Sequence, residues 1–174
     1  MDILIPTWNN AQMLTDCLTS LIAYQEYPYK VHVLNNGMAK DEQGVSFEDF
    51  LHRTFPDNIV YVYNMGENKG WQGALNWAWH NVVESDHMLA LNDDTVFLPW
   101  HRTFLRDLAS HMKHEDVGAV GPVTNVVMGS QHFSHRFSVM HQTSLLIGFC
   151  CLFKSSALQK ISDPDPWDEF LHRS

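Results

Sequence analysis

Residues 59–94, which decide the predicted fold, read IVYVYNMGENKGWQGALNWAWHNVVESDHMLALNDD. The stretch opens with a β-branched and aromatic run, Ile59–Tyr63, and ends with an apolar run, Met88–Leu91, and both runs are typical of strands. Between them, apolar residues recur at helical spacing along one face: Trp71, Leu75, Ala78, Trp79 and Val82. A strand, a helix and a second strand in this order predict two parallel strands joined by a right-handed crossover.

The same alternation extends toward both ends of the chain. Upstream, strands are predicted at 2–6 and 30–34, with helices over 13–22 and 45–55 that bury one stripe each. Downstream, a helix is predicted over 104–112, a strand over 117–120 and a short helix after Ser155, and residues 145–153 form a near-continuous apolar run interrupted by Gly148. Residues 123–144 are polar and predict either a long loop or short irregular strands. The predicted fold is therefore a single α/β domain with a mostly parallel central sheet flanked by helices.

Composition limits the function classes. The 174 residues contain 20 acidic and 11 basic side chains, a net charge of −9, so the chain is a poor binder of nucleic-acid backbones and anionic membranes. No apolar run approaches the ~20 residues that span a bilayer, and residues 1–6 lack the basic start of a signal peptide. Three cysteines, Cys17, Cys150 and Cys151, give no disulfide framework, so we expect a reduced, cytoplasmic location.

Polar residues follow four of the predicted strands. They are Pro6-Thr7-Trp8-Asn9, Asn35-Asn36-Gly37, Asn68-Lys69-Gly70 and Asn92-Asp93-Asp94. In open α/β sheets, ligands bind outside the carboxyl ends of the strands. Each segment alone could simply end a strand or cap a helix, but together they favour a binding site.

The aspartate pair is the most informative of these segments. Mg²⁺ and similar hard cations are held by one or two carboxylates together with substrate phosphates. Adjacent residues on a strand point to opposite faces, so one of Asp93 and Asp94 can bind a metal while the other meets a neighbouring group such as a ribose hydroxyl. The alternative is that the pair caps the helix that follows Pro99.

The order of these motifs resembles glycosyltransferase family 2 proteins of the GT-A fold. Ile5-Pro6-Thr7-Trp8-Asn9 is similar to the opening of that family, and Leu34-Asn35-Asn36-Gly37 is similar to its Asp-Asn-Gly turn. Asn68-Lys69-Gly70 with Ala74-Leu75-Asn76 resembles its Asn-x-Gly…Ala-x-Asn element, and Asn92-Asp93-Asp94 resembles its Asp-x-Asp signature. Residues 118–122, Gly148 and Trp167-Asp168-Glu169 continue the family order.

The resemblance implies an inverting transfer of a sugar from a nucleoside diphosphate to an acceptor hydroxyl. It implies a nucleotide-sugar-binding half over 1–122 and a partial acceptor half over 123–174. Trp8 would stack on the base, Asn35 would contact the base edge, Asp93 would lie near the ribose, and Asp94 would bind Mn²⁺ or Mg²⁺. The implied nucleotide-binding residues are Pro6, Thr7, Trp8, Asn9, Asn35, Asn36, Asn68, Lys69, Asn92 and Asp93.

Two departures from the family pattern leave alternatives open. Asn35 replaces an acidic residue, and since an amide both donates and accepts, the base is open: UDP or dTDP is expected ahead of GDP. The family's further acidic residue is missing, since only five residues follow Glu169. Either Asp168 or Glu169 is the catalytic base for a saccharide or other hydroxyl acceptor, or the sequence is a truncated domain. A non-catalytic nucleotide-binding module is the runner-up, and a nucleotidyltransferase is a third alternative that no Gly-rich loop supports.

Other residues carry weaker hypotheses. Metal binding by His132, His135 and His141 is disfavoured because metal ligands need organised partners. Cys150-Cys151 is predicted to be core. Trp100 and Trp167 could stack on a sugar or simply pack.

Overall fold

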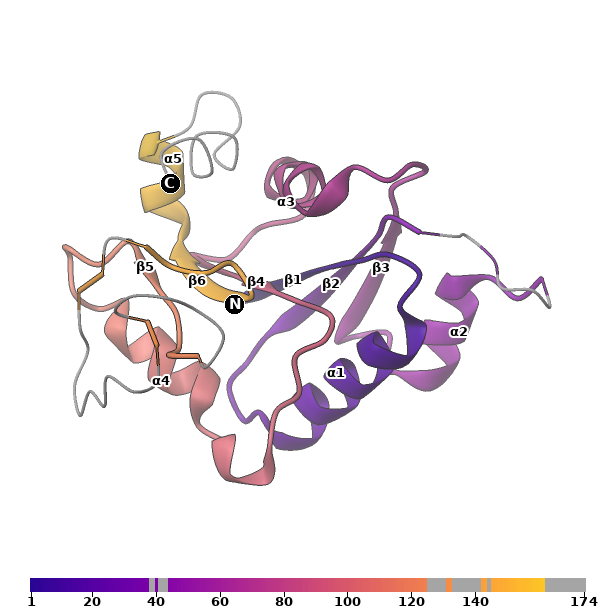
Figure 1. Ribbon diagram of the computed structural model, residues 1–174, viewed down its shortest axis with the longest axis horizontal. Coiled ribbons are helices and arrows are strands. Elements are labelled where there is room, and N and C mark those ends of the chain that lie inside the picture. Colours follow the sequence, from indigo (N-terminus) through magenta and orange to yellow (C-terminus); the bar gives the residue numbers. More distant parts are fainter. Residues whose placement is uncertain (38–39, 41–43, 125–130, 133–141, 144, 162–174) are drawn as a thin grey trace.

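A computed structural model describes residues 1–37, 40, 44–124, 131–132, 142–143 and 145–161 (Figure 1). The elements in chain order are β1 (Asp2–Thr7), α1 (Ala11–Tyr24), β2 (Lys30–Asn35), α2 (Phe47–Thr54), β3 (Val60–Asn64), α3 (Gly70–Asn81), β4 (His87–Leu91), η1 (Pro99–His101), α4 (Phe104–His111), β5 (Ala119–Val120), β6 (Cys150–Lys154) and α5 (Ser155–Ile161). The predicted α/β class with a mostly parallel sheet is confirmed.

The six strands form one sheet in the order β3-β2-β1-β4-β6-β5. β1 pairs in parallel with β2 and β4, and β2 pairs in parallel with β3, whereas β6 is antiparallel to both β4 and β5. All four parallel strands therefore end at one edge of the sheet, which we call the carboxyl edge, and begin at the opposite, amino edge.

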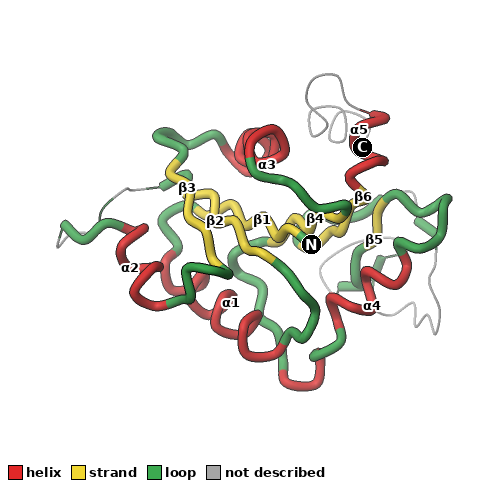
Figure 2. Tube along the Cα trace, turned by 180° about the vertical axis from the view of Figure 1, so that it is seen from behind, coloured by secondary structure: helices red, strands yellow, loops and turns green. Residues whose placement is uncertain are grey.

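Helices cover both faces of the sheet. Figures 1 and 2 show α3 and α5 on one face and α1, α2 and α4 on the other. Alternate residues of the central strands supply the two cores: Ile3 and Ile5 belong to the cluster with α1, whereas Leu4 belongs to the cluster with α3. This two-residue period on strands buried on both faces explains the continuous apolar runs in the sequence.

Three local predictions need correction. The apolar stripes of the helices predicted over 13–22 and 45–55 include Met13 and Phe50, but both side chains are exposed, whereas their neighbours Leu14 and Leu51 are buried. α2 begins at Phe47 rather than residue 45 because Ser46 is its N-cap, with Oγ accepting from the Asp49 amide at 2.9 Å.

The apolar run 145–153 enters the sheet only at Cys150. Before that point the Ile147 amide donates to the Gln131 side-chain oxygen at 2.8 Å, so a buried glutamine takes the place of a strand neighbour. Cys150 and Cys151 are buried in the two cores, as predicted, and burial raises the pKa of the Cys151 thiol to about 12.

Candidate nucleotide site at the carboxyl edge

The carboxyl edge brings together the polar segments that follow β1, β2 and β4. The register aligns Thr7 with Asn35 and Asn35 with Asn64. The backbone N–H of Asn36 donates to the Thr7 carbonyl at 2.9 Å. From the other side of β1, the Thr7 hydroxyl donates to Asp93 Oδ2 at 2.7 Å. Residues 86 positions apart in sequence thus meet across the ends of β1 and β4.

The two aspartates have different surroundings. Asp93 is partly buried and bound to Thr7, whereas Asp94 is exposed and makes no hydrogen bond or ion pair with another described residue. The helix-cap alternative is wrong, because Leu98 precedes η1 and Thr103 is the N-cap of α4. The pair therefore has no capping role, and one carboxylate is turned inward while the other is open.

Asn92 and Cys17 lie beneath the pair. The backbone N–H of Asn92 donates to the Phe149 carbonyl at 2.8 Å, and this bond joins the end of β4 to the start of β6. Cys17, on α1, places Sγ 3.9 Å from the Asn92 carbonyl, and its burial, reinforced by the charges of Asp93 and Asp94, raises the pKa of the thiol to about 12. This cysteine is a neutral part of the floor and not a nucleophile.

A series of hydrogen bonds fixes the orientation of the side-chain amide of Asn35, a residue that is only 4% exposed. Its Oδ1 accepts from the Gly37 amide at 2.9 Å, and its Nδ2 donates to Asn64 Oδ1 at 2.9 Å. Asn64 Nδ2 in turn donates to Glu48 Oε2 at 3.0 Å. A backbone N–H can only donate and a carboxylate can only accept, so both ends of the chain impose one orientation on the two amides.

Asn36 joins β2 to the start of α3. Its Oδ1 accepts from the Lys69 amide at 3.2 Å, and its Nδ2 donates to the Gly70 carbonyl at 3.1 Å. Asn68 accepts from the Gly70 amide at 2.9 Å and so forms the turn that begins the helix. Lys69 is exposed and pairs with Glu67 at 2.8 Å.

The loops after β1 and β2 approach each other closely. A Cβ on Gly37 would collide with the side chain and backbone nitrogen of Asn9, and Asn9 itself has a positive φ of 54°. Trp8, which directly follows β1, is 60% exposed at this edge. At Gly148 a Cβ would lie 3.2 Å from the indole of Trp71 at the start of α3, so the glycine allows close packing there.

The residues present fit a hard divalent cation. Among the described residues, no group of three His, Cys, Asp or Glu side chains could hold a metal ion. An open carboxylate such as Asp94 nevertheless suits a cation whose remaining ligands come from phosphates and water. His132 belongs to no such group, whereas His135 and His141 lie outside the described residues, as do Asp168, Glu169 and Trp167.

Two other features lie at the amino edge. Gln25, which follows α1, donates to the His101 carbonyl at 2.7 Å, so the exposed Trp100 lies beside the amino-edge end of α1. An open cavity of about 380 Å³ is lined by Trp79, His80, Val83, Glu84, Ser85, Asp86, Ser155 and Gln159. The polar segments that follow β1, β2 and β4 lie at the opposite, carboxyl edge, which is where open α/β sheets bind ligands.

Comparison with known proteins places the chain in a family. The model of glycosyl transferase family 2 matches residues 2–162, most of the sequence. The chain belongs to glycosyl transferase family 2. No curated protein sequence gives a significant match.

Solved structures of glycosyltransferases share the fold. The mannosyltransferase PcManGT from Pyrobaculum calidifontis, in complex with GDP-Man and Mn²⁺, is 22% identical with a TM-score of 0.68, and the alignment covers 92% of this chain and 46% of that one. S. aureus TarS 1-349 is 17% identical with a TM-score of 0.65, covering 91% and 48%. The galactosyltransferase LgtC, in complex with donor and acceptor sugar analogs, is 13% identical with a TM-score of 0.64, covering 99% and 64%.

These similarities concern the fold, and the GT-A expectation is confirmed. The family 2 chain described here spans about half the length of PcManGT and of TarS 1-349. Within its described residues, no helix is both long and apolar enough to cross a membrane.

Proposed function

We propose that this chain binds a nucleoside-diphosphate sugar at the carboxyl edge and transfers the sugar to an acceptor hydroxyl with inversion. The observation that carries the proposal is the aspartate pair at the end of β4, with Asp93 held by Thr7 and Asp94 open. Family membership supports the reaction class. Among the structural neighbours, PcManGT was solved with GDP-Man, and TarS 1-349 was solved with UDP-GlcNAc and with UDP.

Different residues of the carboxyl edge would contact different parts of the nucleotide-sugar donor. The exposed indole of Trp8 offers a flat surface for the base, and Asn35 lies at the base edge with its amide already oriented. The free oxygen of Asp93 accepts from a ribose hydroxyl, and Lys69 lies near the base or the diphosphate. Asp94 would hold Mn²⁺ or Mg²⁺, and the positive charge of that cation would stabilise the diphosphate leaving group.

Transfer also needs a base for the acceptor. The acceptor oxygen forms a bond to the anomeric carbon as the bond to the diphosphate breaks, and a carboxylate takes the hydroxyl proton. We assign this role to Asp168 or Glu169, with a saccharide or other hydroxyl compound as acceptor. A uridine or thymidine diphosphate sugar is the proposed donor, ahead of a guanosine diphosphate sugar.

Thermal unfolding of the purified protein with UDP, dTDP, GDP and CMP, each with and without Mn²⁺, tests the proposal. A nucleotide at about 100 times its dissociation constant stabilises the folded state by about 2.7 kcal/mol. For a chain of this size the melting temperature should then rise by about 5–10 °C, and the rise should require Mn²⁺. No rise with any nucleotide would contradict the proposal, and a rise without turnover would favour a non-catalytic binding module.

A further inference from the structure

β3 is the last strand of the sheet, and its outer side pairs with no other described strand (Figure 2). The register with β2 turns the backbone groups of the odd-numbered residues of 59–65 toward β2, so those of Val60, Val62 and Asn64 point outward. Of these outward groups, only the N–H of Val60 bonds to another described residue, the Pro56 carbonyl at 3.0 Å. The outer side of β3 therefore presents a row of backbone donors and acceptors to an incoming strand.

β3 lacks the features that usually protect the outer strand of a sheet. Its sequence, VYVYN, contains no charged residue and no proline. The neighbouring helix α2 contacts β3 through side chains, since Glu48 accepts from Asn64 Nδ2 at 3.0 Å and Leu51 shares an apolar cluster with Val60. These contacts satisfy none of the outward backbone groups.

We propose that β3 pairs with β3 of a second copy of this chain, antiparallel and centred on Val62, so that two sheets join into one. The inference goes beyond the proposed function and does not depend on it. The sequence of the strand argues for a second copy, because VYVYN reads nearly the same in both directions. Antiparallel pairing about Val62 sets Tyr61 opposite Tyr63 of the second copy, and Val60 opposite Asn64.

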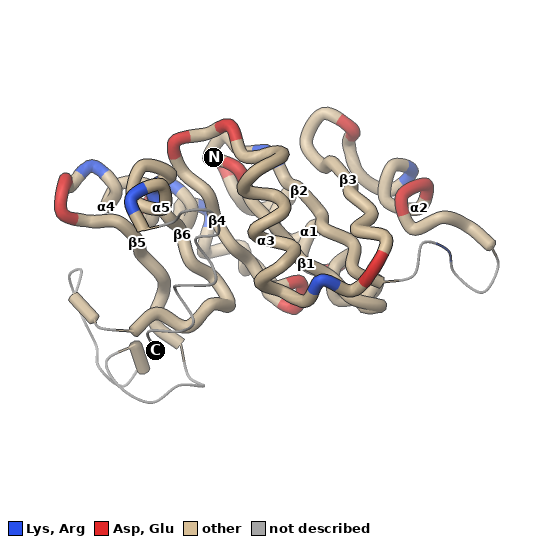
Figure 3. Tube along the Cα trace, turned by 90° about the horizontal axis from the view of Figure 1, so that it is seen from above, with Lys and Arg blue, Asp and Glu red and all other residues tan. Residues whose placement is uncertain are grey.

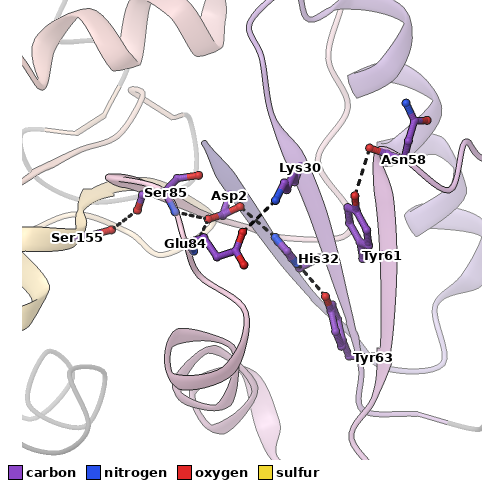
Figure 4. Close-up of polar contacts among 9 residues, drawn as sticks. All are labelled: Asp2, Lys30, His32, Asn58, Tyr61, Tyr63, Glu84, Ser85 and Ser155. Atoms are coloured by element: carbon purple, nitrogen blue, oxygen red, sulfur yellow. Dashed lines mark hydrogen bonds and ion pairs between the residues drawn. The ribbon is translucent and has the colours of Figure 1, made fainter.

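This register uses the outward backbone groups. Val62 would exchange both of its backbone hydrogen bonds with Val62 of the second copy, and the Asn64 N–H would donate to the Val60 carbonyl of the second copy. The tyrosines would then occupy the closer, non-hydrogen-bonded positions, where aromatic pairs stabilise a sheet. Tyr61 and Tyr63 are half-buried (Figure 4), and Tyr63 packs on Trp77 of α3 with ring centroids 5.4 Å apart. The second copy would extend this aromatic layer.

Sedimentation velocity of the 20.1 kDa chain, from about 1 to about 300 μM, tests the association. The parent protein should change from monomer to dimer within this range. Val62→Pro removes an outward N–H that the folded monomer does not use, so the variant should remain folded by circular dichroism. Because each copy loses a hydrogen bond to the other, Val62→Pro should associate at least about tenfold more weakly.

Mixed cysteine variants test the register and do not depend on the folding of Val62→Pro. Opposite non-hydrogen-bonded residues have Cα atoms about 4.5 Å apart, within reach of a disulfide, whereas the same residue in the two copies lies about 8 Å away, beyond that reach. Under mild oxidation, Tyr61→Cys mixed with Tyr63→Cys should give at least about fivefold more linked dimer than either variant alone. Tyr61→Cys mixed with Thr19→Cys, which is exposed on α1, is the matched control and should give no excess. The native cysteines are all buried.

Three results would overturn the inference. A parent protein that stays monomeric at every concentration would leave the outer side of β3 to solvent or to a strand of another protein. A dimer that cross-links equally in mixed and single cysteine variants would use a different surface. Undiminished association of a folded Val62→Pro would show that the outward N–H is not used. None of these results bears on nucleotide binding, so failure of the dimer and failure of the proposed function are distinguishable.

Discussion

Each edge of the sheet has an aspartate beside a buried strand: Asp2 begins β1 at the amino edge, and Asp94 follows β4 at the carboxyl edge. The surroundings of the two carboxylates differ. At the amino edge, Asp2 accepts from His32 Nε2 at 3.1 Å and from the amides of Glu84 and Ser85 at 2.9 and 2.8 Å (Figure 4). At the carboxyl edge, Asp94 accepts from no other described residue. Figure 3 shows charged residues on α2 and α4 as well as near both ends of α3, which itself carries no Lys, Arg, Asp or Glu.

The difference distinguishes structural polar groups from those available to a ligand. Asp2 is 1% exposed, and its three bonds tie β1 to β2 and to the loop before β4. His32 continues the network to the Tyr63 hydroxyl at 3.4 Å, and its ring stacks with those of Tyr61 and Tyr63. A buried carboxylate must be satisfied in this way to be stable, whereas an open one is ready for an incoming cation.

The largest expected effect is on stability at the amino edge. Asp2→Ala should lower the free energy of unfolding by about 3 kcal/mol, because it removes the partner of a buried histidine and of two backbone amides. Chemical denaturation measures the loss, and Asp86→Ala, on the same loop but exposed, is the control expected to stay within about 0.5 kcal/mol. Equal effects of the two substitutions would contradict the structural role of Asp2.

The Asp2 contribution should depend on pH. Burial alone would raise the pKa of Asp2, but the hydrogen bonds from His32, Ser85 and Glu84 outweigh it and hold the pKa well below its usual value. Since the pKa is lower in the folded state, the stabilisation is present above the unfolded pKa of about 4 and is lost as the pH falls below it. The stability gap between the parent and Asp2→Ala should be constant from pH 6 to 5 and should shrink toward pH 3.

The second effect is on ligand binding at the carboxyl edge. Asp94→Asn should weaken Mn²⁺-dependent nucleotide binding by about 100-fold, or about 2.7 kcal/mol, because an amide is a poor substitute for a carboxylate beside a divalent cation. The melting temperature without ligand should not fall, because Asp94 holds no described neighbour. A stability loss like that of Asp2→Ala, with unchanged binding, would reverse the comparison of the two edges.

A third, smaller effect uses two exposed tryptophans. Trp8 is 60% exposed at the carboxyl edge and Trp100 is 74% exposed beside the end of α1. Trp8→Ala should weaken nucleotide binding about tenfold, the loss of one stacked base, while Trp100→Ala should leave the dissociation constant unchanged. Titration calorimetry with UDP and Mn²⁺ decides between them, and equal losses would remove the stacking role of Trp8.

The smallest effect concerns the amide chain at Asn35. Asn35→Asp places an acceptor against Asn64 Oδ1, and turning Asn64 over would bring that oxygen to Glu48. The substitution should weaken nucleotide binding several-fold, and Glu48→Gln, which can donate, should restore about 1 kcal/mol of the loss in the double variant. If the effects of the two substitutions on the binding free energy are strictly additive, the hydrogen bonds through Asn64 to Glu48 do not control the orientation of Asn35.

Sequence patterns were sufficient for the parallel sheet and for the edge at which polar segments gather, because both follow from residue period and strand order. The partner of Asp93 was not predictable, since Thr7 and Asp93 meet only through the pairing of β1 with β4. Asn64 and Glu48 were missed for the same reason, although Asn64 directly follows a predicted strand. The pairing of Asp2 with His32 at the amino edge was predictable, because both residues interrupt apolar strands and buried polar residues need partners.

The most direct test of the carboxyl-edge site is to locate the cation. Crystals grown with Mn²⁺ and the nucleotide that gives the largest thermal shift would be measured at the manganese absorption edge. We predict one strong anomalous peak about 2.1 Å from a carboxylate oxygen of Asp94, bridging to the diphosphate, with the base over Trp8. A peak in the amino-edge cavity near Glu84 and Asp86, with none at Asp94, would contradict the account.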